Sequence, residues 1–280
     1  MKEHMSSRGS RYNSLKLKQT IVLSDKLVFL TFTALLTEIV CMYQMKGTAN
    51  LGVFDLLPMT TLFQGSLIEN LLAWLIPLLA SLICGKQFNT YYPVRNSIFT
   101  RVKRRSFVMK LAKSAAISSF AGILYYHLCC LFFCILIGKI ADPSMPMGVS
   151  MYLNSSGALL QSFYESMPIL YLLMYFLLSS MYGAVFGLIG FITSCLMRNR
   201  IAVFFSPYAV MMISSILLAV LPRGFGILID YNAFCVLKPS VLTYLPIKMQ
   251  MMIGFSAPIF WALLLFILIR IITGKDQIWE

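Results

Sequence analysis

The chain has 280 residues, of which 59% are hydrophobic and only 12% are charged, and its formal net charge is +13. Soluble domains average about 45–50% apolar and about 25% charged residues, so a water-exposed surface cannot accommodate this excess of apolar side chains. The composition excludes an ordinary soluble protein and predicts an all-α membrane protein, because a backbone in lipid must satisfy its own hydrogen bonds.

The first 26 residues are polar and basic, and we predict that they form a cytoplasmic lead-in to the membrane. Leu17 and Ile21 are four residues apart, and Leu15 and Val22 are seven apart. These spacings place the four side chains on one side of an amphipathic helix on the inner membrane surface. The Leu-Lys-Leu-Lys alternation also fits a strand, and a disordered basic tail is the third alternative.

Six apolar stretches are long enough to cross the membrane as helices, which takes about 20 residues each. They cover residues 27–45, 67–85, 114–138, 167–196, 201–221 and 251–273. The remaining residues are too few for a separate catalytic domain, so residues 1–280 are predicted to form a single transmembrane domain.

The distribution of lysine and arginine predicts the orientation of these spans. A cytoplasmic amino terminus places 18 of the 23 basic residues on the inner side. This bias predicts a multi-pass protein of the cell membrane with both termini in the cytoplasm. Membrane lipids with anionic head groups account for much of the net charge, so no nucleic acid is expected as a partner.

Glu38 lies well inside the first predicted span. A charged side chain at the centre of a membrane helix costs about 2.5–3.5 kcal/mol on insertion scales, so a buried one is paired or faces water. Glu38 is therefore a candidate for a polar contact in a transport pathway. The alternative is a hydrogen bond between packed helices, made in the protonated state.

The cytoplasmic loop 86–113 carries eight basic residues, and Pro93 and Asn96 mark a turn and a helix cap within it. An apolar ridge and a basic ridge follow at helical spacing, formed by Ile98, Phe99 and Val102 and by Arg101, Arg104 and Arg105. A short amphipathic helix of this kind can dock on a cytosolic partner. The alternative is that the charges only orient the spans.

Small residues recur every four positions in the fourth span, at Ser179, Gly183 and Gly187. Such a spacing lets another helix approach closely. The neighbour can belong to this chain or to a second copy. Further along, residues 222–250 are too apolar for a free loop and too interrupted to span. They predict short helices that lie in, or re-enter, the outer leaflet between spans five and six.

Motifs of energy coupling and catalysis are absent from the sequence. There is no GxxxxGK[ST] loop for ATP, no HExxH and no GxSxG. We therefore predict a non-catalytic subunit without a metal or cofactor of its own, which moves something without powering the movement.

The layout resembles the membrane-spanning permease subunit of a bacterial ABC transporter of the type-two exporter class. The resemblance rests on the amphipathic lead-in, the six spans, the apolar outer segment and the basic loop, which reads Cys84-Gly85-Lys86-Gln87-Phe88 and continues from Ile98 to Lys110. It implies that residues 98–105 form a coupling helix on an ATPase subunit. Arg101 and Arg105 resemble the arginines that flank the turn into the third span in that family.

The resemblance further implies a cytosolic ABC ATPase that binds ATP and a second permease chain, in a homodimer or a heterodimer. A peptide, antibiotic or lipid-like substrate would pass between the two chains. The alternatives are a stand-alone membrane transporter or scaffold of a membrane complex, and a membrane-embedded enzyme.

Overall fold

A computed structural model of the protein describes residues 25–43, 46, 52–57, 67–84, 103–145, 147, 167–197, 199–220 and 246–273. Every regular element in these ranges is a helix, and no strand occurs among them, which confirms the predicted all-α class. The described residues do not include the lead-in up to residue 24, residues 86–102 of the basic loop, or residues 222–245 of the outer segment. The predictions for these segments stay predictions.

The described elements follow one another along the chain as long helices and one short 3-10 helix. They are the amino-terminal helix Asp25–Tyr43, the 3-10 helix η1 (Val53–Leu56), α3 (Leu67–Cys84), α6 (Arg104–Ala141), α8 (Pro168–Leu196), α9 (Arg200–Val220) and α12 (Ile247–Ile272). Their ends agree with the predicted spans to within four residues, with one exception. α6 begins at Arg104, ten residues before the predicted start at 114.

Four of these helices are long and apolar enough to cross a membrane, as expected for a membrane protein. They are the amino-terminal helix and the stretches Arg105–Ala141, Ile169–Leu196 and Lys248–Ile272. The described apolar stretch in α9, Arg200–Ser214, is shorter, and α3 has 18 residues. The described residues therefore establish four candidate spans, not the six that were predicted.

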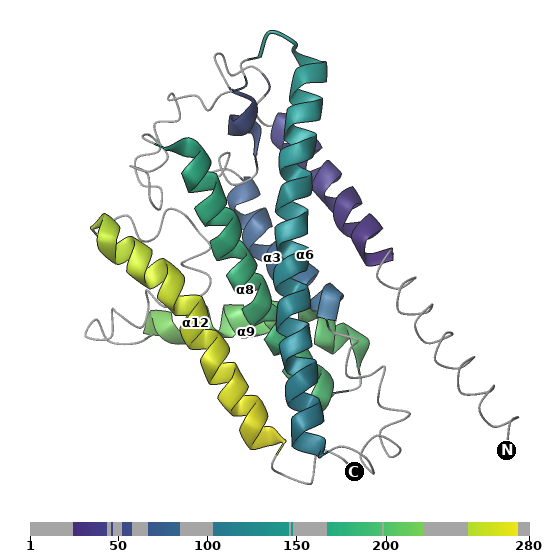
Figure 1. Ribbon diagram of the computed structural model, residues 1–280, viewed down its shortest axis with the longest axis vertical. Coiled ribbons are helices and arrows are strands. Elements are labelled where there is room, and N and C mark those ends of the chain that lie inside the picture. Colours follow the sequence, from purple (N-terminus) through teal and green to yellow (C-terminus); the bar gives the residue numbers. More distant parts are fainter. Residues whose placement is uncertain are drawn as a thin grey trace, which may run out of the picture.

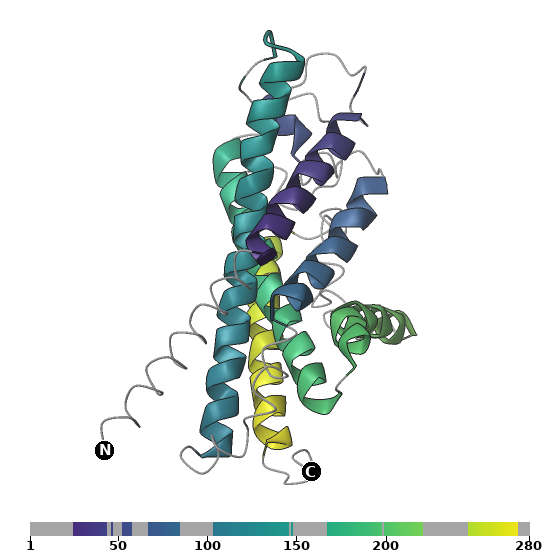
Figure 2. The same ribbon diagram turned by 90° about the vertical axis from the view of Figure 1, so that its right-hand side faces the viewer.

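α9 differs most from the predicted arrangement, because it runs across the other helices instead of along them (Figure 1, Figure 2). The chain turns sharply before it, and the side-chain oxygen of Asn199 accepts a hydrogen bond from the Ile201 N–H at 2.9 Å. The Ser81 hydroxyl of α3 donates to the Phe204 carbonyl at 2.8 Å. The first bond caps the start of α9, and the second holds the beginning of α9 against α3.

The first turn of α6 and the last turns of α8 and α12 lie at the same end of the bundle (Figure 1, Figure 2). Arg105 in α6 and Arg270 in α12 are both exposed there. Basic residues that were predicted to share one side of the membrane thus share one end of the molecule.

α6 ends at the opposite end of the bundle in a tight turn. The backbone N–H and the hydroxyl of Ser144 both donate to the Asp142 carboxylate, at 3.0 and 2.6 Å. The hydrogen bond from the Ser144 hydroxyl, together with that from the Ser144 N–H, holds the pKa of the Asp142 carboxyl group below its ordinary value. Lys139 donates to the Met145 carbonyl at 2.8 Å and closes the turn.

α8 forms the centre of the bundle. Within an apolar 18-residue segment of α8, 67% of the residues are buried, against 28% in the corresponding segment of the amino-terminal helix and 33% in those of α6 and α12. One cluster of buried apolar side chains lies mainly between the amino-terminal helix, α3, α6 and α8. A second joins the first turns of α6 to the last turns of α8 and α12. α6, α8 and α12 each contribute buried residues to both clusters.

Lys26 links the start of the amino-terminal helix to the end of α3, where it donates a hydrogen bond to the Ile83 carbonyl. The last carbonyls of a helix lack intrahelical donors and carry partial negative charge, so an ammonium group stabilises them. Lys26→Met is expected to lower the free energy of unfolding by about 1 kcal/mol, because the carbonyl loses this donor. Denaturant titration in detergent measures this change. Asp25→Asn at the neighbouring exposed position is the control, and an equal change in both variants would contradict the prediction.

Candidate functional site

The amino-terminal helix buries one carboxyl group, that of Glu38, which is 0% exposed. The Cys130 thiol of α6 lies beside it, yet no described group makes a hydrogen bond of regular geometry to either carboxyl oxygen. Among the side chains whose burial the structure describes, Glu38 is the only buried acidic one. An ionisable residue inside a membrane is costly to bury and is by default a candidate for function.

Two contacts between side-chain hydroxyl groups join the amino-terminal helix to α6 near this carboxyl group. The Tyr126 hydroxyl donates to Thr37 Oγ1 at 3.0 Å, and Thr31 Oγ1 and the Tyr125 hydroxyl lie 2.9 Å apart. We define the polar seam as the facing side chains of Thr31, Thr37, Glu38, Tyr125, Tyr126 and Cys130. These side-chain contacts fix the register of the two helices, because a hydrogen bond forms only when its donor and acceptor face each other.

His127 and Ser179 join α6 to α8 next to the seam. Nε2 of His127 and Oγ of Ser179 lie 2.7 Å apart, and the imidazole stacks on Phe176 with ring centroids 5.1 Å apart and an interplanar angle of 8°. Both His127 and Ser179 are buried. The pair and the stack together orient α8 relative to α6.

The contact between Ser179 and His127 is also the one that a serine nucleophile makes with its base. Nδ1 of His127, however, has no hydrogen-bond partner among the described residues, so nothing described there orients the ring as a catalytic base requires. Within the same ranges, no three His, Cys, Asp or Glu side chains are grouped to hold a metal ion. The arrangement supports helix packing and polar contact, and it offers no described catalytic set.

Gly183 brings α8 close to α6. A Cβ atom at this position would lie 2.6 Å from Ile123 Cγ1 and 3.3 Å from the Ser119 carbonyl oxygen. Gly187, one turn further on, is buried as well. Gly183 thus serves packing within this chain, which is one of the two uses that its spacing predicts.

The predicted coupling residues are only partly covered by the described ranges. Four of them lie outside: Ile98, Phe99, Arg101 and Val102. Arg104 and Arg105 form the first turn of α6 instead of ending a separate short helix, and the backbone of Lys103 is non-helical before them. The physical reason is that good helix formers such as Met109, Lys110 and Leu111 follow, without a Pro or Gly.

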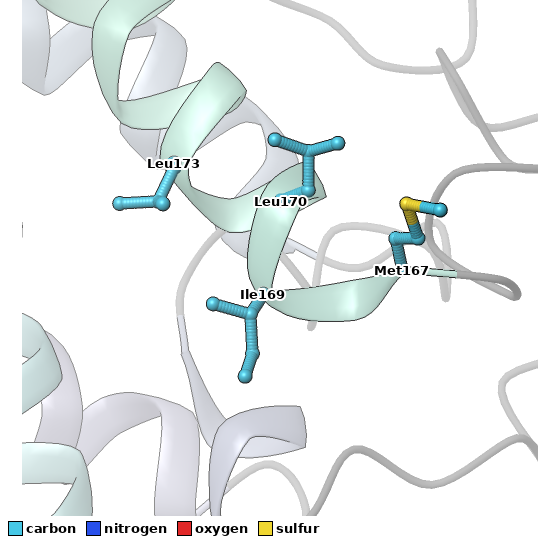
Figure 3. A pocket seen from close by; sticks show the side chains of 4 residues that line it. All are labelled: Met167, Ile169, Leu170 and Leu173. Atoms are coloured by element: carbon cyan, nitrogen blue, oxygen red, sulfur yellow. The ribbon is translucent and has the colours of Figure 1, made fainter.

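A shallow pocket of about 410 Å³ lies at the first turns of α8 (Figure 3). Its lining consists of Met167, Ile169, Leu170 and Leu173, which are all apolar. Specific ligand sites add a few convergent polar groups to an apolar lining. These four side chains suit a lipid chain or a neighbouring helix, and they confer no chemical specificity.

The sequence predicts Glu38 as a candidate, but it does not predict that Tyr126 and Cys130 of α6 lie beside it. A signal was present, because the buried residues Tyr126, Cys130 and Cys134 recur four apart on one face of α6. The spacing indicates a buried stripe. It does not indicate which helix the stripe faces.

Comparison of the chain with models of known protein families finds no match, and searches of curated proteins and of solved structures find none either. The resemblance to ABC permeases therefore stays a prediction from the residues.

Proposed function

We propose that the chain is the membrane-spanning permease subunit of an ATP-driven exporter of the ABC type-two class. In this proposal six helices cross the cell membrane and both termini face the cytoplasm. α3 and α9 are the second and fifth of these spans, which requires α9 to turn from its crosswise direction in the single chain (Figure 1, Figure 2) to the direction of the bundle. Two chains, identical or sister, form the pathway for a peptide, antibiotic or lipid-like substrate. A separate cytosolic subunit binds and hydrolyses ATP.

One observation carries the proposal: α6 continues from the basic loop into the bundle as a single helix. Its 38 residues correspond to about 57 Å, whereas the hydrocarbon core of a bilayer is about 30 Å thick. Its first turn presents Arg105, which is exposed. A helix that extends so far beyond the hydrocarbon can pass the movement of a docked ATPase into the bundle.

α6 also contacts the amino-terminal helix and α8, the two helices on either side of it. It bonds to the amino-terminal helix through Tyr126 and to α8 through His127, and Ile123 packs on Gly183. A displacement of α6 therefore acts on both helices together. Alternating access requires such a bundle to have two arrangements whose populations depend on the nucleotide state.

The second candidate function is a stand-alone membrane transporter, or a scaffold of a membrane complex. The buried Glu38 carboxyl favours the transporter, because carboxyl groups inside membranes mark ion and proton pathways. Transport by the purified chain in ATP-free vesicles would establish this alternative and exclude the ABC proposal.

The combined substitutions Arg101→Glu, Arg104→Glu and Arg105→Glu are expected to abolish co-purification of an ATPase subunit. Their acidic side chains would invert the charge of the docking face, and like charges across an interface cost several kcal/mol. The measurement is affinity purification of the tagged chain from membranes, followed by detection of a protein with an ATP-binding GxxxxGK[ST] loop. Lys139→Glu, at the other end of α6, is the control. Unchanged association of the triple variant, with normal membrane insertion, would contradict the docking.

A further inference from the structure

The exposed face of α6 changes from basic to apolar within one turn. Lys110 and Lys113 are exposed, and Ile117, which is 68% exposed, lies four residues after Lys113 on the same face. Further along, Leu128 and Phe132 are exposed as well. Exposed apolar side chains in such a row belong in lipid, so the change at Lys113 marks the edge of the hydrocarbon layer.

The exposed side chains of α12 indicate the same edge of the hydrocarbon layer. Val108 and Ala112, on the opposite face of α6, share a buried cluster with Leu265 and Ile269 of α12. At this level α12 turns large apolar side chains outward, namely Leu264, Ile267, Leu268 and Ile271. Arg270 is exposed at this level too. Lys110 and Lys113 therefore lie at the level of the bundle where lipid-facing side chains give way to basic ones.

The two lysines have no acidic partner within the described part of the chain, where no ion pair involves either of them. A lysine at this depth lays its aliphatic stem along apolar surface and extends its ammonium group to the head-group region. Anionic phosphates supply the missing charge there. Charge complementarity thus points to lipid as the occupant of this face.

We propose that Lys110 and Lys113 form a binding site for the phosphate group of an anionic phospholipid, of the phosphatidylglycerol class. The site begins beyond the proposed ATPase contact, because Lys110 and Lys113 lie five and eight residues after Arg105, which corresponds to about 8 and 12 Å along the helix. The lipid holds α6 at the level where α6, α8 and α12 share their buried cluster. The site does not depend on the proposed transport function.

The test uses the purified full-length chain in a neutral detergent, equilibrated with equal amounts of phosphatidylglycerol and phosphatidylcholine. Native mass spectrometry counts the lipids that each chain retains. The unmodified chain is expected to prefer phosphatidylglycerol. The Lys110→Gln/Lys113→Gln double variant is expected to lower the ratio of phosphatidylglycerol to phosphatidylcholine by roughly fivefold or more, from the attraction of each lysine to an anionic surface.

Two variants serve as matched controls. Lys139→Gln, at the other end of the same helix, is expected to keep the ratio unchanged, since its ammonium group is bonded to the Met145 carbonyl. Lys110→Arg/Lys113→Arg keeps both charges and is expected to keep the preference. Circular dichroism checks that the helix content of all variants is equal.

Equal ratios in the unmodified chain and in the double glutamine variant would overturn the proposal, as would an equal loss in Lys139→Gln. Loss of ATPase association with an unchanged lipid ratio in the double glutamine variant would assign this face to a protein partner and would also overturn it. Loss of the lipid preference with intact ATPase association would support it.

Discussion

The Gly183→Ala variant is expected to unfold with a free energy about 1–3 kcal/mol lower than that of the unmodified chain, because added atoms in a filled core force neighbours to move. The new Cβ would lie 2.6 Å from Ile123 Cγ1 and 3.1 Å from Ile123 Cβ. Ile123 is fully buried and cannot move away without displacing α6. The measurement is denaturant-induced unfolding in detergent, followed by circular dichroism.

Gly254→Ala in α12 is the matched control for this prediction. The nearest atom to a Cβ at Gly254 is Leu178 Cδ2, at 3.9 Å, which is ordinary van der Waals contact. A second check combines Gly183→Ala with Ile123→Ala, which removes the clashing Cγ1. The pair is expected to be less destabilising than the sum of the two single changes. Additive effects, or equal effects at the two glycines, would contradict close packing of α8 on α6.

The Glu38→Met variant is expected to be more stable than the unmodified chain by about 1–3 kcal/mol, because it replaces a buried polar group without regular hydrogen bonds by an apolar side chain of similar length. Unpaired buried polar atoms cost free energy that an apolar replacement does not. The sign of the change separates the two uses predicted for Glu38. If Glu38 is a polar contact in a pathway, the protein becomes more stable when methionine replaces it. If Glu38 makes a hydrogen bond between packed helices, the replacement removes that bond and the protein becomes less stable.

Thr37→Val is the control, since Thr37 belongs to the same seam and does have a partner. Its removal leaves the buried Tyr126 hydroxyl without this acceptor, so a loss of about 1–3 kcal/mol is expected. The same unfolding measurement serves both variants. A lower stability of Glu38→Met would show that the carboxyl group holds the helices together and would remove it from the pathway.

The ends of most helices could be predicted from the sequence because lipid imposes a simple requirement. A span needs an uninterrupted apolar run, and its backbone must be helical. The start of α6 was not predicted correctly, since Lys110 and Lys113 end the apolar run but do not end the helix. Charged residues end the part of a helix that can lie in lipid. The helix itself ends only where its residues disfavour helical backbone angles.

The candidate site could be predicted only in part. Glu38 was evident, because an acid within an apolar run is conspicuous in any helical register. Its neighbours were not, since Thr37 and Tyr126 are 89 residues apart. Their contact depends on how α6 packs on the amino-terminal helix. The crosswise direction of α9 likewise depends on Asn199 and on the contact of Ser81 with Phe204, which hydropathy does not reveal.

α6 contains no proline, in contrast to α3, α9 and α12, which contain Pro77, Pro207 and Pro258. Ile123, which packs on Gly183 of α8, lies 18 residues from Arg105 and 18 residues from Ala141, or about 27 Å from each. A rigid rod that pivots at its midpoint has two equal arms. A tilt of α6 about Ile123 therefore moves its basic end and its far end by equal distances in opposite directions.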